Sequence, residues 1–196
     1  MKKILGQPIT IRNWELKIAS FFQEQNEAFC LYKGDYEDFK VSDVLVRIHS
    51  ACLTSEVFEM QTCDCKWQLN YGIDLIGESK AGILIYLPYQ EGKGNGLFNK
   101  IQSLELMKSG LSSSDSYQAL GLPADNREYG FAIQILKEFG VKRVKLITNS
   151  PAKVMACVDG GILISERIPA IINNPNKNVL QLLKEKKRDF NHFIEL

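Results

Sequence analysis

Three of the five cysteines in this 196-residue chain lie close together, because Cys52, Cys63 and Cys65 form a C-x10-C-x-C pattern. Three thiolates from two short segments suit zinc, which takes four protein ligands at a structural site but three and a water at a catalytic one. No obvious fourth Cys or His accompanies them, so the pattern favours the open, catalytic arrangement. The alternative is three small buried side chains that pack like hydrophobes. Because Asp64 is charged, we expect the C-D-C segment not to be fully buried.

The other two cysteines, Cys30 and Cys157, have apolar neighbours and are predicted to pack in the core. No segment approaches the roughly 18 to 20 apolar residues of a membrane span, and the N-terminus lacks a signal-peptide core. We therefore expect a cytoplasmic protein whose thiols are reduced. The 24 Lys and Arg nearly balance the 23 Asp and Glu, so net charge gives no reason to expect a nucleic-acid or membrane partner. The C-x-C pair also differs from the C-x2-C knuckle of zinc ribbons.

A glycine-rich segment, QEGKGNGL at 90–97, is the second chemical candidate. It joins an apolar run to a helix-like stretch, so its backbone N–H groups can meet a phosphate at the helix N-terminus. Lys93 and Lys100 can neutralise the phosphate charge, whereas Glu91 suits Mg²⁺ or a base edge. The segment matches neither GxxxxGK[ST] nor GxGxxG. A flexible turn in which the glycines serve only geometry is the alternative.

Two further turns carry cations. The segment PADNRE places Asp125 at a predicted helix N-cap and Arg127 in the first turn, and capping is the purely structural interpretation of Asp125. The segment TNSPAK leaves a strand and enters a helix, so Thr148 and Lys153 can bind a second phosphate. Three turns that each carry a cation favour a polyanionic nucleotide as the ligand.

The elements that must position these residues alternate between apolar strands and amphipathic helices. The predicted strands are Ala28–Tyr32, Val44–Ile48, Ile83–Leu87, Val144–Ile147 and Gly161–Ile164, with Thr10–Lys17 and Ala28–Gly34 as an antiparallel pair. The predicted helices are Trp67–Ile76, Leu97–Ser109, Arg127–Phe139, Ala152–Val158 and Asn178–Phe193. This alternation predicts one three-layer α/β domain with a mixed sheet over residues 1–196. In the last helix we expect the run KEKKRD to be a solvated face and His192 to be a surface residue.

The order of these segments resembles the GTP cyclohydrolase II family. The matching blocks are RIHSACLTSEVFEMQTCDCKWQL, LIYLPYQEGKGNGLFNK, LGLPADNREYGFAIQIL and LITNSPAK, and the resemblance continues through ERIP and NNPNKN. It implies a zinc enzyme of riboflavin synthesis that hydrolyses GTP to formate, pyrophosphate and a diamino-ribosylamino-pyrimidinone phosphate, with Mg²⁺ on the triphosphate. It also implies a homodimer, and we expect the stand-alone form without a dihydroxybutanone-phosphate-forming domain.

This resemblance assigns a role to each candidate residue. The zinc ligands fall on Cys52, Cys63 and Cys65, the proton acceptor on Asp125, and the family's nucleophilic arginine on Arg127. The nucleotide-binding positions fall on Arg47, Gln68, Glu91, Gly92, Lys93, Ser113, Thr148 and Lys153. Zinc lowers the pKa of a bound water from about 16 toward 7, which gives a hydroxide to attack C8 of the purine, and a second hydrolysis releases formate. Because a guanidinium does not deprotonate in proteins, we expect Arg127 to stabilise charge at the α-phosphate instead of attacking it.

Three positions depart from the family pattern. Ala51 stands where the family has a carboxylate, and Lys93 replaces an arginine whose bidentate fork a lysine cannot reproduce. Leu104 replaces a catalytic tyrosine, so we expect deformylation to be weakened more than ring opening. The nearby hydroxyls that can substitute are those of Tyr86, Tyr89 and Tyr117.

Three functions are therefore compatible with the sequence. The first is a zinc-dependent cyclohydrolase acting on GTP or a related purine nucleotide, including a diverged form that stops at the formylated intermediate or takes another nucleotide. The second is a nucleotide-binding protein that has lost turnover. The third is an interaction domain with a structural zinc, which the missing fourth ligand disfavours.

Overall fold

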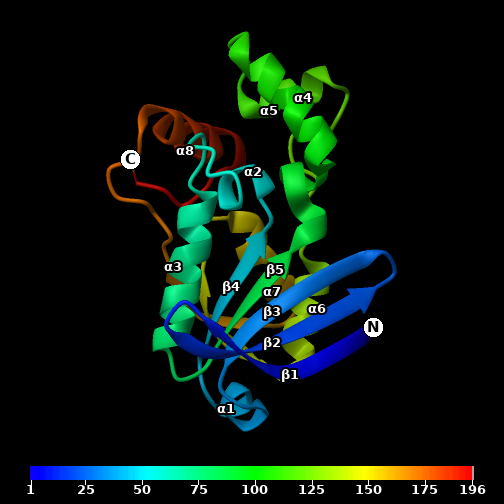
Figure 1. The fold of residues 1–196 in the computed structure, drawn as a ribbon, viewed down its shortest axis with the longest axis vertical. Coiled ribbons are helices and arrows are strands. Elements are labelled where there is room, and N and C mark those ends of the chain that lie inside the picture. The colour runs from blue at the N-terminus through cyan, green and yellow to red at the C-terminus, as the bar shows by residue number, and fades with distance from the viewer. Residues whose placement is uncertain (196) are drawn as a thin grey trace.

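A seven-stranded sheet in the order β1-β2-β3-β5-β4-β6-β7 runs through the computed structural model, which describes residues 1–195 (Figure 1). The strands are β1 (Lys2–Ile11), β2 (Trp14–Gln23), β3 (Asn26–Lys33), β4 (Val44–Ser50), β5 (Gly82–Leu87), β6 (Arg143–Ile147) and β7 (Leu163–Ile168). The pairs β1–β2, β2–β3 and β3–β5 are antiparallel, and the other pairs are parallel. The mixed sheet predicted from the sequence is confirmed.

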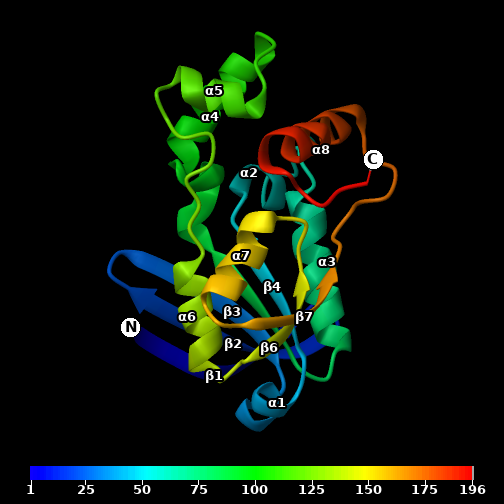
Figure 2. The same ribbon diagram turned by 180° about the vertical axis from the view of Figure 1, so that it is seen from behind.

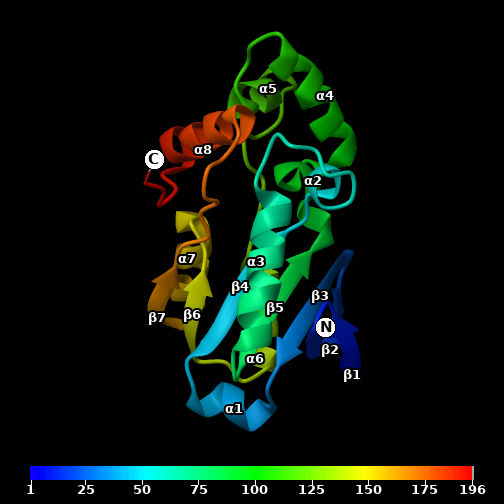
Figure 3. The same ribbon diagram turned by 60° about the vertical axis from the view of Figure 1, so that its left-hand side comes forward.

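Helices cover both faces of this sheet. They are α1 (Tyr36–Val41), α2 (Leu53–Glu56), α3 (Cys65–Glu78), α4 (Gly96–Lys108), α5 (Ser113–Ala119), α6 (Gly130–Glu138), α7 (Pro151–Asp159) and α8 (Lys177–Phe190), with a 3₁₀ segment at Pro88–Gly94. Helix α3 lies on one face (Figure 3), and α6 and α7 lie on the other (Figure 2). This is the three-layer α/β arrangement predicted above. Within residues 1–195, no helix combines the length and the apolar character needed to cross a membrane.

The apolar core follows from the central position of β4 and β5, which are largely buried on both faces and therefore appear in the sequence as continuous apolar runs. Toward α6 and α7 the buried side chains include Phe21, Ile48, Ile83, Ile85, Ile135 and Leu136. Toward α3 they are Leu16, Ile73, Ile76 and Leu84. Cys30 and Cys157 belong to the first cluster, as expected from their neighbours.

The strand pair predicted for the N-terminal third is wrong in one half. Residues 12 and 13 form a tight turn between β1 and β2, where Arg12 has a left-handed φ of 56°, so Thr10–Lys17 spans a hairpin turn. The strand that pairs with β3 is β2, with Lys17 opposite Tyr32. Strand β7 begins at Leu163, after the predicted start, because Gly161 adopts a left-handed φ of 74° in the preceding turn.

Two helix boundaries differ from the prediction by three residues. Helix α6 begins at Gly130, three residues after the predicted start at Arg127. Helix α8 ends at Phe190 because Asn191 takes a left-handed φ of 51°, so His192 lies beyond the helix. Both differences occur where side chains of the candidate site are held.

Gly77 of α3 packs directly against Trp14 of β2. A Cβ at this position would lie 2.3 Å from the Trp14 ring. Gly77→Ala is therefore expected to lower the free energy of unfolding by about 1–3 kcal/mol, although Ala is otherwise the better helix former. Gly130→Ala at the start of α6 is the matched control, because its methyl group would meet no atom of the described residues within 4 Å. Urea unfolding measures both, and equal stability of the two variants would contradict this packing.

Candidate metal and anion site

The carboxyl ends of β5, β4 and β6 meet at one edge of the sheet, where ligand sites of parallel sheets form. The segment after β4 carries Cys52, the 3₁₀ segment after β5 carries Lys93, and the segment after β6 carries Thr148 and Lys153. The topology thus brings together three turns that are about 50 residues apart in the sequence. The candidate metal-binding and phosphate-binding segments therefore lie together at this edge of the sheet.

The three cysteines form a cluster at this edge. Their Sγ atoms lie within 4.8 Å of one another, and the Cys52 and Cys63 Sγ atoms are 3.7 Å apart. Two thiolates bound tetrahedrally at Zn–S distances near 2.3 Å would be about 3.8 Å apart. Cys52 precedes α2 and is buried, whereas Cys63 and Cys65 are half-buried at the start of α3. This donor set and spacing fit a metal ion.

A lysine and a carboxylate support the cluster. Lys100 Nζ on α4 donates to Cys52 Sγ at 3.1 Å and to Glu91 Oε1 at 2.7 Å. Hydrogen bonds from Cys63 and Cys65, together with the Lys100 charge, lower the pKa of Cys52. Glu91 also accepts from the backbone N–H of Leu53 at 2.5 Å and of Gly92 at 2.9 Å. Both Glu91 oxygens therefore face protein donors, and the residue ties the glycine-rich turn to the cysteine segment.

The glycine-rich turn has the backbone conformation that its sequence requires. Gly92, Lys93 and Gly94 have left-handed φ values of 61°, 58° and 80°. A Cβ at Gly94 would lie 2.6 Å from the carbonyl oxygen of Asn126, so only glycine fits there without displacing that backbone. The Asn126 N–H donates to the Lys93 carbonyl at 2.8 Å. This contact places Lys93 beside the segment that carries Arg127.

The Asp125 side chain does not cap a helix, which corrects the N-cap prediction. Helix α6 begins after Tyr129, so residues 125–128 are a loop, and the Asp125 carboxylate instead accepts from Arg127 Nε at 2.8 Å and from the Arg127 backbone N–H at 3.1 Å. Burial would raise the pKa of Asp125, but Arg127 outweighs it and the net shift is downward. The carboxylate thus fixes the direction of the guanidinium.

Several buried cations at this edge lack an anionic partner. Among residues 1–195, the ion pairs leave Lys93, Lys153 and Arg47 without a carboxylate. Lys153 Nζ donates to the Ile48 carbonyl at 2.8 Å, and Arg47 Nη2 donates to Gln68 Oε1 at 2.6 Å, while Arg47 Nε finds no acceptor in the described part of the chain. Burial of an uncompensated charge is costly, so an anion from beyond the described residues would stabilise these groups.

Lys93 has the clearest electrostatic signature of these cations. Its Nζ lies 5.4 Å from the ring centre of Tyr117 and 4.9 Å from that of Phe190. Burial first, and then the nearby Arg127 charge, lower the pKa of Lys93 to about 8. Its charge is therefore only partly held at neutral to mildly basic pH.

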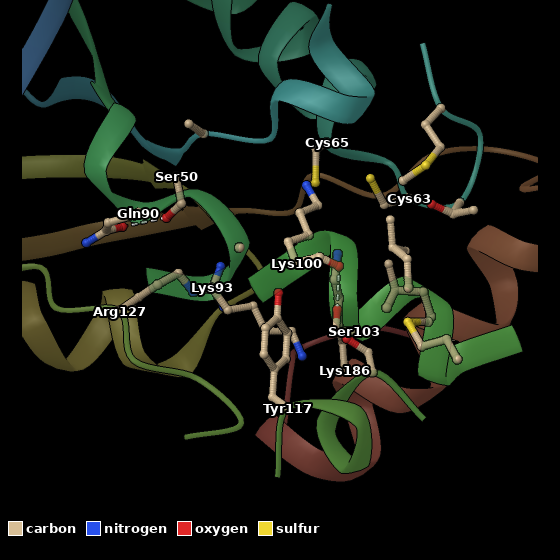
Figure 4. A pocket seen from close by; sticks show the side chains of 18 of the residues that line it. Ser50, Cys63, Cys65, Gln90, Lys93, Lys100, Ser103, Tyr117, Arg127 and Lys186 are labelled. Carbon is tan, nitrogen blue, oxygen red and sulfur yellow. Dashed lines mark hydrogen bonds between the residues drawn. The ribbon is translucent and has the colours of Figure 1, made fainter. Parts of the chain in front are cut away.

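Two adjoining cavities collect the candidate residues, and Cys65 and Arg127 line both. Figure 4 shows the first, with the Lys93, Arg127 and Tyr117 side chains lying around it and Cys63 and Cys65 at its rim. The predicted site residues that line the first cavity are Cys63, Cys65, Gly92, Lys93, Ser113 and Arg127. Those that line the second are Arg47, Cys65, Gln68, Arg127, Thr148 and Lys153. Cys52 and Glu91 reach the first cavity through Lys100, and Asp125 lines a neighbouring cavity with Arg127.

The positions that we expect to depart from the family pattern lie at this site. Ala51 and Leu104 both line the first cavity. Of the three tyrosines that can substitute for the hydroxyl missing at Leu104, Tyr117 lines the same cavity and is 2% exposed. Tyr86 instead donates its hydroxyl to Glu56 Oε2 at 2.6 Å, and Tyr89 packs against Phe131. Tyr117 is thus the phenol positioned to act in this cavity.

Sequence patterns missed two charged residues and one histidine. Lys186, within the run expected to be a solvated face, lines both cavities, and its Nζ donates to Asp64 Oδ1 at 2.9 Å. The C-D-C segment is not fully buried, as expected, because Cys63 and Cys65 are half-buried. Asp64 itself is 2% exposed, and the Lys186 charge compensates its burial. His192 lines the second cavity instead of the open surface. A lysine between two apolar residues at i−4 and i+4, Leu182 and Phe190, was the available signal for an inward-facing position.

The site thus combines three cysteines that could hold a metal ion with cations that lack a carboxylate partner among the described residues. The family model described as GTP cyclohydrolase II matches residues 6–169, and the chain belongs to this family. It is 33% identical to a GTP cyclohydrolase-2 of Streptomyces coelicolor, over all of this chain and 88% of that protein. It is 40% identical to riboflavin biosynthesis protein RibBA of Aquifex aeolicus over 82% of this chain, and 38% identical to RibBA of Rhodococcus jostii over 96%. The chain spans 39% of the first RibBA protein and 46% of the second.

Removal of one cysteine tests the metal site. Cys63→Ser is expected to lose most of the bound zinc, because two thiolates and a hydroxyl hold zinc far more weakly than three thiolates. Cys157→Ala, in the apolar core, is the matched control and should keep the wild-type metal content. Elemental analysis of the purified proteins measures zinc per chain. Wild-type zinc content in Cys63→Ser would exclude the cluster as the site.

The pKa of Lys93 predicts a pH dependence. Because its pKa is lowered to about 8, Lys93 is charged below that pH and neutral above it, so affinity for a nucleotide should fall as pH rises from 7.5 to 9. The loss of one charge-assisted hydrogen bond predicts a decrease of about tenfold. Lys93→Arg stays charged and should flatten the profile. Calorimetric titration with a non-hydrolysable GTP analogue measures both proteins, and an equal decline in the variant would contradict this assignment.

Proposed function

We propose that this protein is a zinc-dependent GTP cyclohydrolase II in riboflavin biosynthesis. It would open the imidazole ring of GTP at C8 and release formate and pyrophosphate, leaving a diamino-ribosylamino-pyrimidinone phosphate. The observation that carries the proposal is the three-thiolate cluster beside buried cations that lack carboxylate partners among the described residues. Family membership over residues 6–169 supports the same reaction.

Cys52, Cys63 and Cys65 would hold the zinc, with the fourth position open. Bound there, zinc would supply a water whose pKa is lowered toward about 7. Lys100 stabilises the Cys52 thiolate through its 3.1 Å contact. Glu91 keeps Lys100 in place at 2.7 Å. The chain's own residues thus prepare one ligand in its charged form before a metal arrives.

The cations would bind and orient the triphosphate. Arg127 and Lys93 line the first cavity, and Lys153, Arg47 and Thr148 line the second. Asp125 holds the Arg127 guanidinium through the 2.8 Å hydrogen bond from Nε, so Arg127 would stabilise charge at the α-phosphate, and the Asp125 carboxylate is the acceptor that could take up a proton there. Gln68, Gly92 and Ser113 would complete the nucleotide contacts, and Mg²⁺ would accompany the phosphate oxygens.

Exposed apolar side chains on and beside α4 support a homodimer. Phe98 is 77% exposed on α4, and Phe58, just after α2, is 71% exposed. The start of α2 meets α4 through the contact of Cys52 with Lys100, so these rings lie on neighbouring elements. Exposed apolar groups of this kind mark association surfaces, and a second copy of the chain is the proposed partner.

We treat residues 1–196 as one domain because all seven strands, from β1 at Lys2 to β7 at Ile168, belong to a single hydrogen-bonded sheet. A cytoplasmic location is proposed from the free thiols of all five cysteines, which suit a reducing compartment.

A second candidate outcome is a cyclohydrolase that stops at the formylated intermediate. The observation that favours it is Leu104, which lines the cavity without a donor or an acid. The observation that opposes it is Tyr117, whose buried phenol lines the same cavity and whose pKa is raised by burial, so it stays a hydrogen-bond donor. The two outcomes differ in whether formate appears.

Separate assays of ring opening, formate and pyrophosphate test the proposed function. With zinc and Mg²⁺ present, the wild-type protein should release one formate and one pyrophosphate per GTP opened. Tyr117→Phe should lower formate release at least tenfold while ring opening, followed by absorbance, changes less, because one buried hydrogen bond to the reacting group is lost. Tyr89→Phe is the matched control.

The possible results separate the candidates. Ring opening without formate in the wild-type protein would establish the arrested reaction. Nucleotide binding without any ring opening would leave a binding protein and contradict the proposed enzyme. Equal formate release by Tyr117→Phe and Tyr89→Phe would remove Tyr117 from the chemistry.

A further inference from the structure

The C-terminal helix α8 forms one wall of the first cavity. Leu182, Lys186 and Phe190 are spaced four residues apart, so they share one face of the helix, and all three line the cavity. The family match ends at residue 169, before α8 begins. A segment outside the matched residues therefore contributes to the candidate site.

Specific contacts hold α8 in this orientation. Val179 and Leu183 are buried with Ile194 in a small apolar cluster, which packs part of the same face of the helix against the rest of the protein. The Glu185 carboxylate accepts from the Ser113 backbone N–H at 3.0 Å, and the Ser114 hydroxyl donates to Asp189 Oδ2 at 2.7 Å. These contacts fasten α8 to α5, beside which it lies (Figure 3). Lys186 is thereby directed toward the cavity.

Lys186 occupies the junction of the two cavities and lines both, as Arg127 does. Its Nζ donates to Asp64 Oδ1 at 2.9 Å, and the other Asp64 oxygen accepts from Gln68 Nε2 at 2.6 Å. An ammonium group carries three N–H donors, and Asp64 uses one of them. The Lys186 side chain is 20% exposed, so the remaining donors can reach a ligand in the cavities.

We propose that Lys186 is a further nucleotide-binding residue, which contacts a phosphate group at the junction of the two cavities while Asp64 fixes its position. The inference rests on the proposed function, because it assigns the anion to the nucleotide. It makes α8 part of the binding site, so the affinity for substrate depends on a helix that the family match does not include. Asp64, between two of the cysteines, then links the metal segment to the phosphate contacts.

Charge-matched variants of α8 test this role. Lys186→Gln and Lys184→Gln remove the same charge from the same helix, but Lys184 is exposed. The probes are inorganic tripolyphosphate and a non-hydrolysable GTP analogue, titrated by calorimetry. Lys186→Gln should bind both probes about 10- to 100-fold more weakly. Lys184→Gln should change the affinity less than twofold, and Lys186→Arg should recover most of it, with zinc content unchanged in all three.

Differential acetylation of the wild-type protein gives a second measurement that needs no variant. Tripolyphosphate should slow the acetylation of Lys186 and leave that of Lys184 unchanged, as measured by mass spectrometry. Equal rates at Lys186 with and without tripolyphosphate would overturn the proposal, as would equal affinities of the two Gln variants. Failure of the wild-type protein to bind either probe would instead contradict the proposed function itself.

Discussion

Buried cations without carboxylate partners shape the whole active edge of this protein. Lys153 follows β6 and Arg47 lies within β4, and among the described residues they donate to carbonyl oxygens, an amide oxygen and a histidine ring nitrogen instead of carboxylates. Burial first, and then repulsion by Arg47, lowers the pKa of Lys153 well below its ordinary value. Such an arrangement is costly in the free protein and is relieved when a polyanion binds. The remaining residues of the site leave these cations accessible to such a polyanion.

Three carboxylates of the site each pair with one of its cations, which leaves Lys93, Lys153 and Arg47 as the site cations without a carboxylate among the described residues. Glu91 is occupied by Lys100 and two backbone donors, Asp125 by Arg127, and Asp64 by Lys186 and Gln68. In each case the carboxylate positions a neighbouring group and does not line the ligand space alone. The cysteine cluster is a further source of negative charge, because its thiols would lose their protons on binding a metal ion, which would neutralise the thiolates.

Local sequence signals predicted the parts of this site that depend on local chemistry. The spacing of Cys52, Cys63 and Cys65 and the glycines around Lys93 specify their own turns, and the apolar runs specify the central strands. Local sequence patterns do not predict that Lys186 faces inward, because its direction depends on the tertiary contact between α8 and α5. The sequence predicts a cap at Asp125 because the residues after it look helical, but the loop before α6 extends to Tyr129. The turn at Arg12 contains no Gly, although Arg12 has a left-handed φ, so the local sequence does not predict this hairpin.

The most direct test of this account is a crystal structure of the zinc-loaded protein with a non-hydrolysable GTP analogue, with the metal located by anomalous scattering. The account predicts a zinc peak about 2.3 Å from the Sγ atoms of Cys52, Cys63 and Cys65. It also predicts phosphate oxygens on Arg127 and Lys93, with the purine C8 toward the metal. A zinc ion closed off by a fourth protein ligand, or a nucleotide bound away from these cations, would contradict it.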